Sequence, residues 1–153
     1  MTESRRFYLG FWEELLAELS LDDSSQPMPN PTGAGNIFFP MPPAAGTAWL
    51  TAYCSKATMQ AGVFLRFKRG NYGDTAYDLL LAEREEIDSE LEGAAEWTSI
   101  DGKHSVALKR AFDDLYADRN RADLKAFLLE SINRMVNVFR PRLERIAEEV
   151  GGG

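Results

Sequence analysis

The only histidine of the chain, His104, lies close to residue types that carry out hydrolytic chemistry. It directly follows the triplet Asp101-Gly102-Lys103, in which one residue separates an acid from a lysine, as in some nucleases. Imidazole exchanges protons near neutral pH, so a histidine at this place could act as a general base. The alternative is structural, because Asp-Gly is a favoured two-residue turn between antiparallel strands. We favour the turn, and we predict that His104 is neither catalytic nor a metal ligand.

Acidic residues crowd the segment 83–92 and could together hold a divalent cation. They are Glu83, Glu85, Glu86, Asp88, Glu90 and Glu92. Acidic runs on helices more often form a solvated face, and this is the interpretation we favour. A chain with a single histidine also has no histidine-rich zinc site. The sequence therefore predicts no catalytic residue, no metal and no cofactor.

Composition limits the possible classes of protein. The chain has 153 residues, of which 44% are hydrophobic, so we expect one folded domain over residues 1–150 and a flexible glycine tail over 151–153. Its net charge of −7 opposes nonspecific binding to nucleic acid or to an anionic membrane. The single cysteine, Cys54, excludes an intrachain disulfide, and no apolar run approaches the length of a membrane span. We therefore expect a cytoplasmic protein.

The hydrophobic spacing of the first half predicts a helix and then three strands. Apolar residues recur every four positions from Phe7 to Leu19, which is typical of an amphipathic helix. The segment 20–36 is rich in proline, glycine and polar residues and is predicted to be a loop. A short strand over 37–39 should end at Pro40. Two further strands, over 47–54 and 60–68, are predicted to form a hairpin through residues 55–58.

The second half begins with a turn at 71–74, where Asp74 is a suitable N-cap for a helix. That helix is expected to end near Gly93. A final helix should start near Asp118, and Pro141 is expected to kink or divide it. The apolar positions assigned to the first of these helices are Tyr77, Leu80, Leu81, Ile87 and Leu91.

A second hairpin lies between these helices, and its register follows from the Asp-Gly turn. If Asp101 and Gly102 form the turn, Ser99 faces His104 and Trp97 faces Val106. The predicted architecture is α+β, with an antiparallel sheet of about five strands in the order α-βββ-α-ββ-α. The sheet packs against helices that include a long C-terminal one.

The central strands are apolar on both faces. Leu50, Ala52 and Cys54 alternate with Trp49, Thr51 and Tyr53, and Phe64 and Arg66 lie in the next strand. Helices or a loop could cover both faces. Otherwise one face is left with exposed aromatics beside a cation, which suits a protein partner. We predict a partner-binding site formed by Trp49, Tyr53, Phe64 and Arg66, with self-association as the simplest use of it.

Three segments carry a resemblance to a known family. Phe11 and Trp12 lie in the first helix, Ile87, Gly93 and Trp97 in the middle, and Phe139, Pro141 and Arg142 near the end. Together they resemble a prokaryotic domain family of unknown function. Its members stand alone or follow nuclease-like domains, often in defence-type contexts. The resemblance implies an accessory role and supplies no catalytic residues.

Two functions from different classes therefore remain. The first is a non-catalytic protein-interaction or assembly module, accessory to a nuclease or a defence-type effector. The second is a nucleic-acid-binding accessory domain that combines stacking aromatics with basic side chains. Net acidity favours the first, and the absence of a converging acid, base and nucleophile in the sequence disfavours an enzyme. The basic residues of the second hypothesis are Arg66, Lys68, Arg69, Lys109 and Arg110.

Overall fold

The computed structural model describes residues 1–43 and 46–150; the predicted flexible tail over 151–153 lies outside them. These residues form four helices and five strands. In order they are α1 (Glu3–Glu18), β1 (Asn36–Met41), β2 (Ala48–Ser55), β3 (Gln60–Phe67), α2 (Asn71–Ala82), α3 (Arg84–Glu90), β4 (Glu96–Ile100), β5 (Lys103–Ala111) and α4 (Asp118–Glu149). This is the predicted α-βββ-α-ββ-α order, with the middle helix present as a pair.

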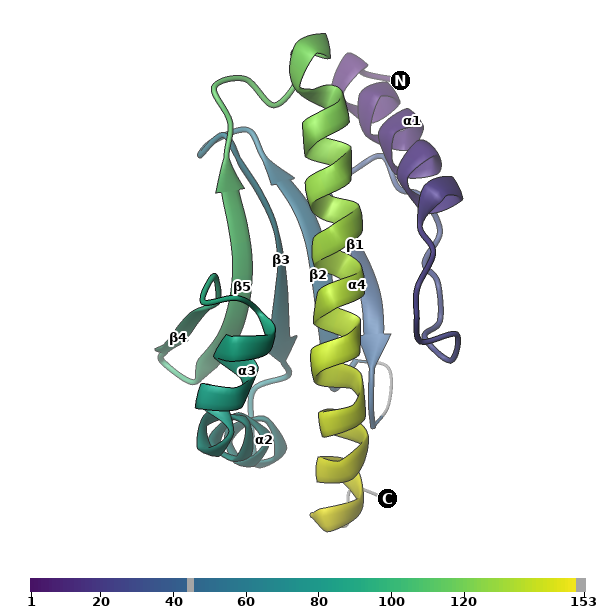
Figure 1. Ribbon diagram of the computed structural model, residues 1–153. Coiled ribbons are helices and arrows are strands. Elements are labelled where there is room, and N and C mark those ends of the chain that lie inside the picture. The colour runs from purple at the N-terminus through teal and green to yellow at the C-terminus, as the bar shows by residue number, and fades with distance from the viewer. Residues whose placement is uncertain (44–45, 151–153) are drawn as a thin grey trace.

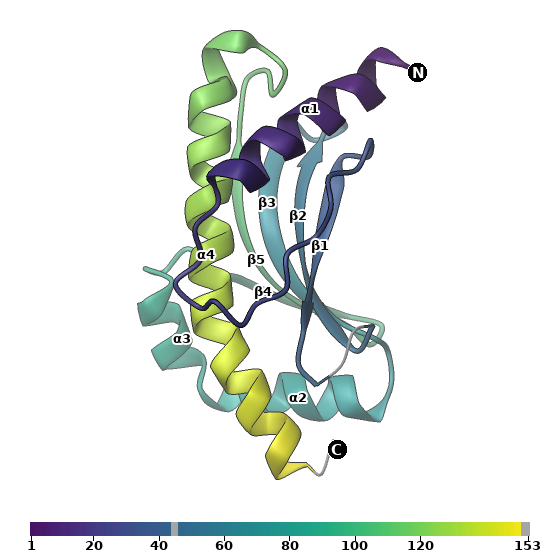
Figure 2. The same cartoon turned by 90° about the vertical axis from the view of Figure 1, so that its right-hand side faces the viewer.

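The five strands form one antiparallel sheet in the order β1-β2-β3-β5-β4. Helix α4 lies along the middle strands, chiefly β3, and α3 lies on the same side over the β4–β5 hairpin (Figure 1). Helix α1 lies beside β1 on the helix side, and α2 crosses one end of the sheet (Figure 2). In the described part of the chain, no helix lies against the opposite face of the sheet.

The core lies between the sheet and these helices. Helix α1 begins at Thr2, whose Oγ1 accepts from the Arg5 amide at 3.2 Å, as an N-cap should. The middle of its predicted apolar face is buried, whereas Phe7 and Leu19 at the two ends are partly buried. Trp12 donates through Nε1 to the Ala34 carbonyl at 2.8 Å. Helix α4 continues as one helix through Pro141, so of the two expected effects of this proline, a kink or a division, the division does not occur. The buried positions of α4 are Leu124, Leu128, Ser131, Ile132, Met135, Val136, Val138, Phe139, Leu143 and Ile146.

The middle helical segment differs from its prediction in two ways. Helix α2 begins at Asn71 with Gly70 as its N-cap, so Asp74 lies in the first turn and does not cap it. The single helix expected between Asp74 and Gly93 is divided at Glu83, where the backbone leaves helical geometry (φ −105°, ψ 14°). Leu80, Ile87 and Leu91 are buried as expected. Gly93 follows the end of α3 with φ +74°, a conformation that suits glycine.

Strand β1 is longer than predicted, because Pro40 lies within it. Proline is tolerated there because β1 is an edge strand, where a missing N–H removes no ladder hydrogen bond. The loop over 20–35 packs against this edge. Gln26, which is buried, donates through Nε2 to the Pro40 carbonyl at 2.9 Å and accepts from Arg140 through Oε1.

The β4–β5 hairpin has the predicted register. Trp97 faces Val106, Ser99 faces His104, and Ile100 faces Lys103. Asp101 and Gly102 form the turn with φ of 52° and 76°, so both central residues are left-handed, as a type I′ turn requires. The Asp-Gly pair therefore has a backbone role, as the sequence predicted.

Candidate functional site

The sheet face without helices carries all four residues of the predicted partner-binding site. Strand register places Trp49 opposite Arg66, and Thr51 opposite Phe64. Tyr53 lies on the same face of β2, because strand side chains alternate. Leu50, Ala52 and Cys54 point to the helix side and are buried. In the described residues no helix covers this face (Figure 2), but Trp49, Tyr53 and Phe64 are half-buried there and not exposed as expected.

The aromatic side chains of this face are ordered by close packing. Gly62 lies opposite Tyr53, and a Cβ atom at Gly62 would lie 2.9 Å from the Tyr53 ring, so glycine makes room for it. The ring centroids of Tyr53 and Phe64 are 5.5 Å apart. The Arg66 guanidinium lies 4.4 Å from the centroid of the Phe64 ring, which is a cation–π distance. Burial raises the pKa of the Tyr53 hydroxyl, the main cause being desolvation.

Two polar atoms in this face are buried without hydrogen-bond partners in the described chain. One is Thr51 Oγ1, in a side chain that is only 2% exposed between Phe38 and Phe64 of the neighbouring strands. The other is Arg66 Nε. Leaving a buried donor or acceptor unpaired costs roughly 1–3 kcal/mol.

Two hollows lie side by side along the helix-free face. The first, of about 280 Å³, is lined by Phe38, Pro40, Gly46 and Trp49. The second, of about 220 Å³, contains Arg66 beside Tyr53 and Phe64, and the Glu96–Lys109 ion pair (3.2 Å) forms its rim. The face is therefore apolar toward β1 and charged toward β4. Phe38 also belongs to this face, although it was not assigned to it from the sequence; its side chain is 52% exposed and extends the apolar end. Phe38 and Pro40 are two positions apart, and residues at that spacing in a strand share a face, so the sequence did carry a signal for Phe38.

The basic residues of the nucleic-acid hypothesis are not brought together. Arg66 and Lys109 share the helix-free face, and Lys109 is paired with Glu96. Arg110 follows Lys109 in β5 and so points to the opposite side, where it lies 3.9 Å from Asp123. Lys68 and Arg69 lie beyond the end of β3 and are exposed. The structure thus offers no continuous basic track along the aromatic face.

His104 takes part in a chain of hydrogen bonds that the sequence did not reveal. Its Nδ1 lies 2.8 Å from Ser99 Oγ, and its Nε2 lies 2.7 Å from Asp74 Oδ1. Since a carboxylate accepts, the consistent tautomer donates from Nε2 to Asp74 and accepts from the Ser99 hydroxyl. The ring also stacks on Tyr77, at 4.5 Å between centroids.

A serine, a histidine and an aspartate in this order resemble a hydrolytic triad, but the surroundings favour a structural role. Triads bury the acid, whereas the Asp74 side chain is 56% exposed. The three side chains line none of the hollows described above. The contacts join α2 to the β4–β5 hairpin across 30 residues of sequence. His104 therefore ties a helix to the sheet, and its predicted lack of a catalytic role remains a prediction.

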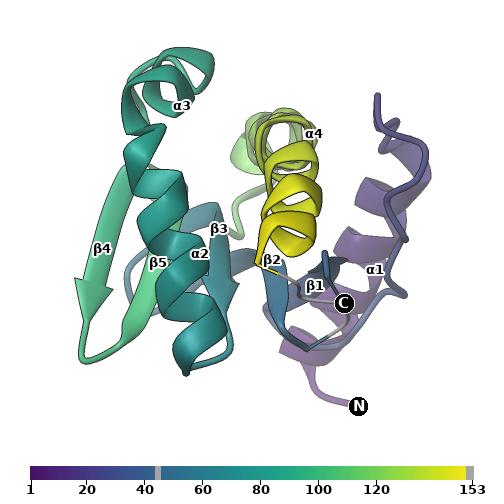
Figure 3. The same cartoon turned by 90° about the horizontal axis from the view of Figure 1, so that it is seen from below.

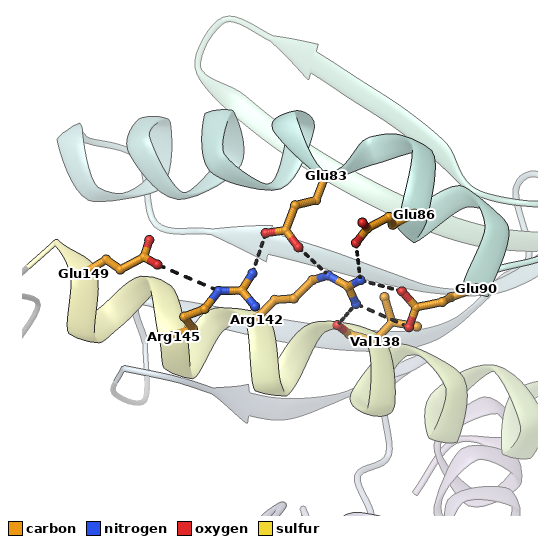
Figure 4. A network of polar contacts seen from close by, with 7 residues as sticks. All are labelled: Glu83, Glu86, Glu90, Val138, Arg142, Arg145 and Glu149. Carbon is orange, nitrogen blue, oxygen red and sulfur yellow. Dashed lines mark hydrogen bonds and ion pairs between the residues drawn. The ribbon is translucent and has the colours of Figure 1, made fainter.

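The sequence suggested that the acidic segment 83–92 is a solvated helix face. In the structure, two of its glutamates also form ion pairs with arginines of α4. Arg142 of α4, 12% exposed, lies 3.2 Å from Glu83 and 2.5 Å from Glu90, and it donates to the Val138 carbonyl (Figure 4). Arg145 reaches the other oxygen of Glu83 at 2.5 Å. These contacts join the break between α2 and α3 to the long helix. Within the described residues, no group of three or more His, Cys, Asp or Glu side chains forms a metal site.

Comparison with known proteins adds no relative. No family model, no curated protein and no solved structure matches the chain. Among the described residues, no helix is both long and apolar enough to cross a membrane.

Proposed function

We propose that the chain is a non-catalytic protein-interaction module that binds its partner through the helix-free sheet face. The observation that carries the proposal is the combination on this face of the half-buried aromatics Trp49, Tyr53 and Phe64 with the Arg66 guanidinium, 4.4 Å from the Phe64 ring. Contiguous apolar patches bordered by polar groups mark protein interaction sites. Aromatic and arginine side chains also contribute most of the binding energy at such sites.

The chemistry of the face indicates the kind of partner. An apolar side chain would enter the hollow between Phe38 and Trp49. An acidic or carbonyl oxygen would pair with Arg66, whose guanidinium lies 4.4 Å from the centroid of the Phe64 ring. The partner is another protein surface with one apolar anchor and one acceptor. A nuclease-like or defence-type effector is the partner that the family resemblance suggests.

The test places a photo-crosslinking benzoylphenylalanine at Phe64, in the middle of the face, and in a matched variant at Ala126, which is exposed on α4. Both are irradiated in cells of the source organism. We expect a discrete protein adduct from position 64 that is absent from position 126 and is lost when Tyr53→Glu is added. Adducts of equal intensity from both positions, or none from position 64, would contradict the proposal.

A nucleic-acid-binding accessory remains the second candidate, because Trp49, Tyr53 and Phe64 are suited to base stacking. The scattered positions of the basic residues weigh against this function, and Lys109 is already paired with Glu96. Fluorescence anisotropy of a labelled single-stranded oligonucleotide separates the two functions. Binding that weakens steeply with salt and is lost in Arg66→Ala would favour nucleic acid.

A further inference from the structure

The two edge strands of the sheet, β1 and β4, differ in whether other parts of the chain cover their outward peptide groups. At the β1 edge, Gln26 Nε2 donates to the Pro40 carbonyl and Thr32 Oγ1 donates to the Asn36 carbonyl, each at 2.9 Å. Pro40 has no N–H to offer. Side chains and a proline therefore block this edge, which is how natural sheets prevent unwanted strand pairing.

The β4 edge has no such protection. Strand β4 is last in the sheet order, and no other part of the described chain lies beyond it (Figure 3). Four of its five residues are exposed, and Ile100 is 67% exposed. The strand contains no proline and no lysine. Such an edge presents unpaired N–H and C=O groups to any second strand.

The hairpin fixes which peptide groups point outward. In a hairpin with a two-residue turn, the flanking pair, here Ile100 and Lys103, exchanges both hydrogen bonds. Hydrogen-bonded pairs alternate with non-hydrogen-bonded pairs along an antiparallel ladder, so Thr98 and Glu96 also point their peptide groups toward β5. The peptide groups of Trp97 and Ser99 therefore point to the free edge. Neither makes a backbone hydrogen bond to another segment of the described chain.

We propose that β4 pairs with β4 of a second copy, antiparallel, about a two-fold axis at Thr98. In this register Trp97 of one copy faces Ser99 of the other, and both have outward peptide groups. Four N–H···O=C bonds form across the axis. Glu96 faces Ile100, so no like charges lie opposite each other. The result is a continuous sheet of ten strands in which the helix-free faces of both copies lie side by side.

A second copy is the occupant because the strand is complementary to itself in both hydrogen bonding and charge. Closed two-fold assemblies are also the commonest ones among soluble proteins. The contact is small, and each copy carries a net charge of −7. We therefore expect a weak dimer with a dissociation constant of about micromolar size. Its affinity rises with salt, because salt screens the repulsion between two acidic copies.

The first test is a disulfide trap in a Cys54→Ala background. Thr98 faces itself in a non-hydrogen-bonded pair, with Cα atoms about 4.5 Å apart, which a disulfide can span. Ile100 is the matched control, since it lies on the same strand and face but about 14 Å from its copy. We expect mild oxidation to give a covalent dimer with Thr98→Cys and little with Ile100→Cys. Equal yields, or no dimer from Thr98→Cys, would overturn the register.

The second test separates this edge from the helix-free face. Sedimentation equilibrium compares the wild type with Thr98→Glu, which puts two carboxylates opposite each other, and with Tyr53→Glu. We expect Thr98→Glu to be monomeric and Tyr53→Glu to dimerise like the wild type. Dimerisation lost in Tyr53→Glu and kept in Thr98→Glu would assign self-association to the face and overturn the edge pairing. The pairing would also be overturned if the wild type stayed monomeric at a protein concentration about a hundred times the expected dissociation constant.

Discussion

Asp74 and His104 are joined by a 2.7 Å contact between Oδ1 and Nε2, although they lie in different elements. Asp74 is in the first turn of α2, and His104 is near the start of β5. The contact fixes the end of a helix to the rim of the sheet next to β4. It gives the only histidine of the chain a structural role.

The contact between Asp74 and His104 should be measurable as a small coupling. His104→Ala removes two hydrogen bonds and the stack on Tyr77, so we expect a loss of about 1–2 kcal/mol in the free energy of unfolding. Asp74→Ala should cost less, because its side chain is half exposed. A double-mutant cycle by urea denaturation should give a coupling of about 0.5 kcal/mol. A coupling of zero would mean that the contact does not contribute to stability.

Trp97 is packed against the core but is only half buried, and it donates to Asp88 Oδ1 at 2.7 Å. Trp97→Phe keeps most of the packing and loses the hydrogen bond, so about 1 kcal/mol should be lost. Trp97→Ala should cost about 3 kcal/mol, near the lower limit for aromatic truncations. Thr98→Ala, on the opposite face of β4, is the control and should change little. If Trp97→Ala has the same melting temperature as the wild type, the packing described for this residue is wrong.

Arg142 should contribute more to stability than its neighbour Arg145. Arg142 is 12% exposed and contacts Glu83, Glu86 and Glu90, whereas Arg145 is 49% exposed. Arg142→Met leaves the partly buried Glu83 without its best-shielded partner, and we expect a loss of about 2–3 kcal/mol. Arg145→Met is the matched control and should cost clearly less. Equal losses in urea denaturation would show that burial of the pair has no consequence.

Cys54 should be unreactive until the protein unfolds. Burial raises the pKa of its thiol from 9.0 to about 12, so almost no thiolate forms in the folded protein at pH 8. A thiol-reactive dye should label Cys54 slowly in buffer and rapidly in denaturant. Fast labelling of the folded protein would contradict the burial of this side chain.

The same shift predicts how stability depends on pH. The unfolded thiol loses its proton above about pH 9, while the folded one keeps it until about pH 12. The unfolded state then binds fewer protons, so the contribution of Cys54 is complete below pH 9 and is lost as the pH rises toward 12. Cys54→Ala should lose less stability than the wild type between these limits. Parallel losses in the two proteins would contradict the raised pKa.

Local sequence determined the elements whose geometry depends on near neighbours. The Asp101-Gly102 pair set the type I′ turn, and the alternation of side chains then set the register of β4 and β5, because both depend on residues a few positions apart. The same alternation correctly separated Trp49, Tyr53, Phe64 and Arg66 from the buried face. Pro40 was predicted to end the first strand, but a proline can lie within an edge strand. Whether a strand lies at the edge depends on the strand order, which the local sequence does not show.

Tertiary structure decided the features that join distant segments. The break at Glu83 accompanies contacts with Arg142 and Arg145, which lie about 60 residues away and leave no periodic signal. Asp74 meets His104, and not the end of its own helix, for the same reason. Which face of the sheet stays uncovered, and which edge is blocked by Gln26, depended on where the helices and the loop pack. Hydrophobic spacing identifies the residues that can be buried, but only packing selects the surface that remains free to bind.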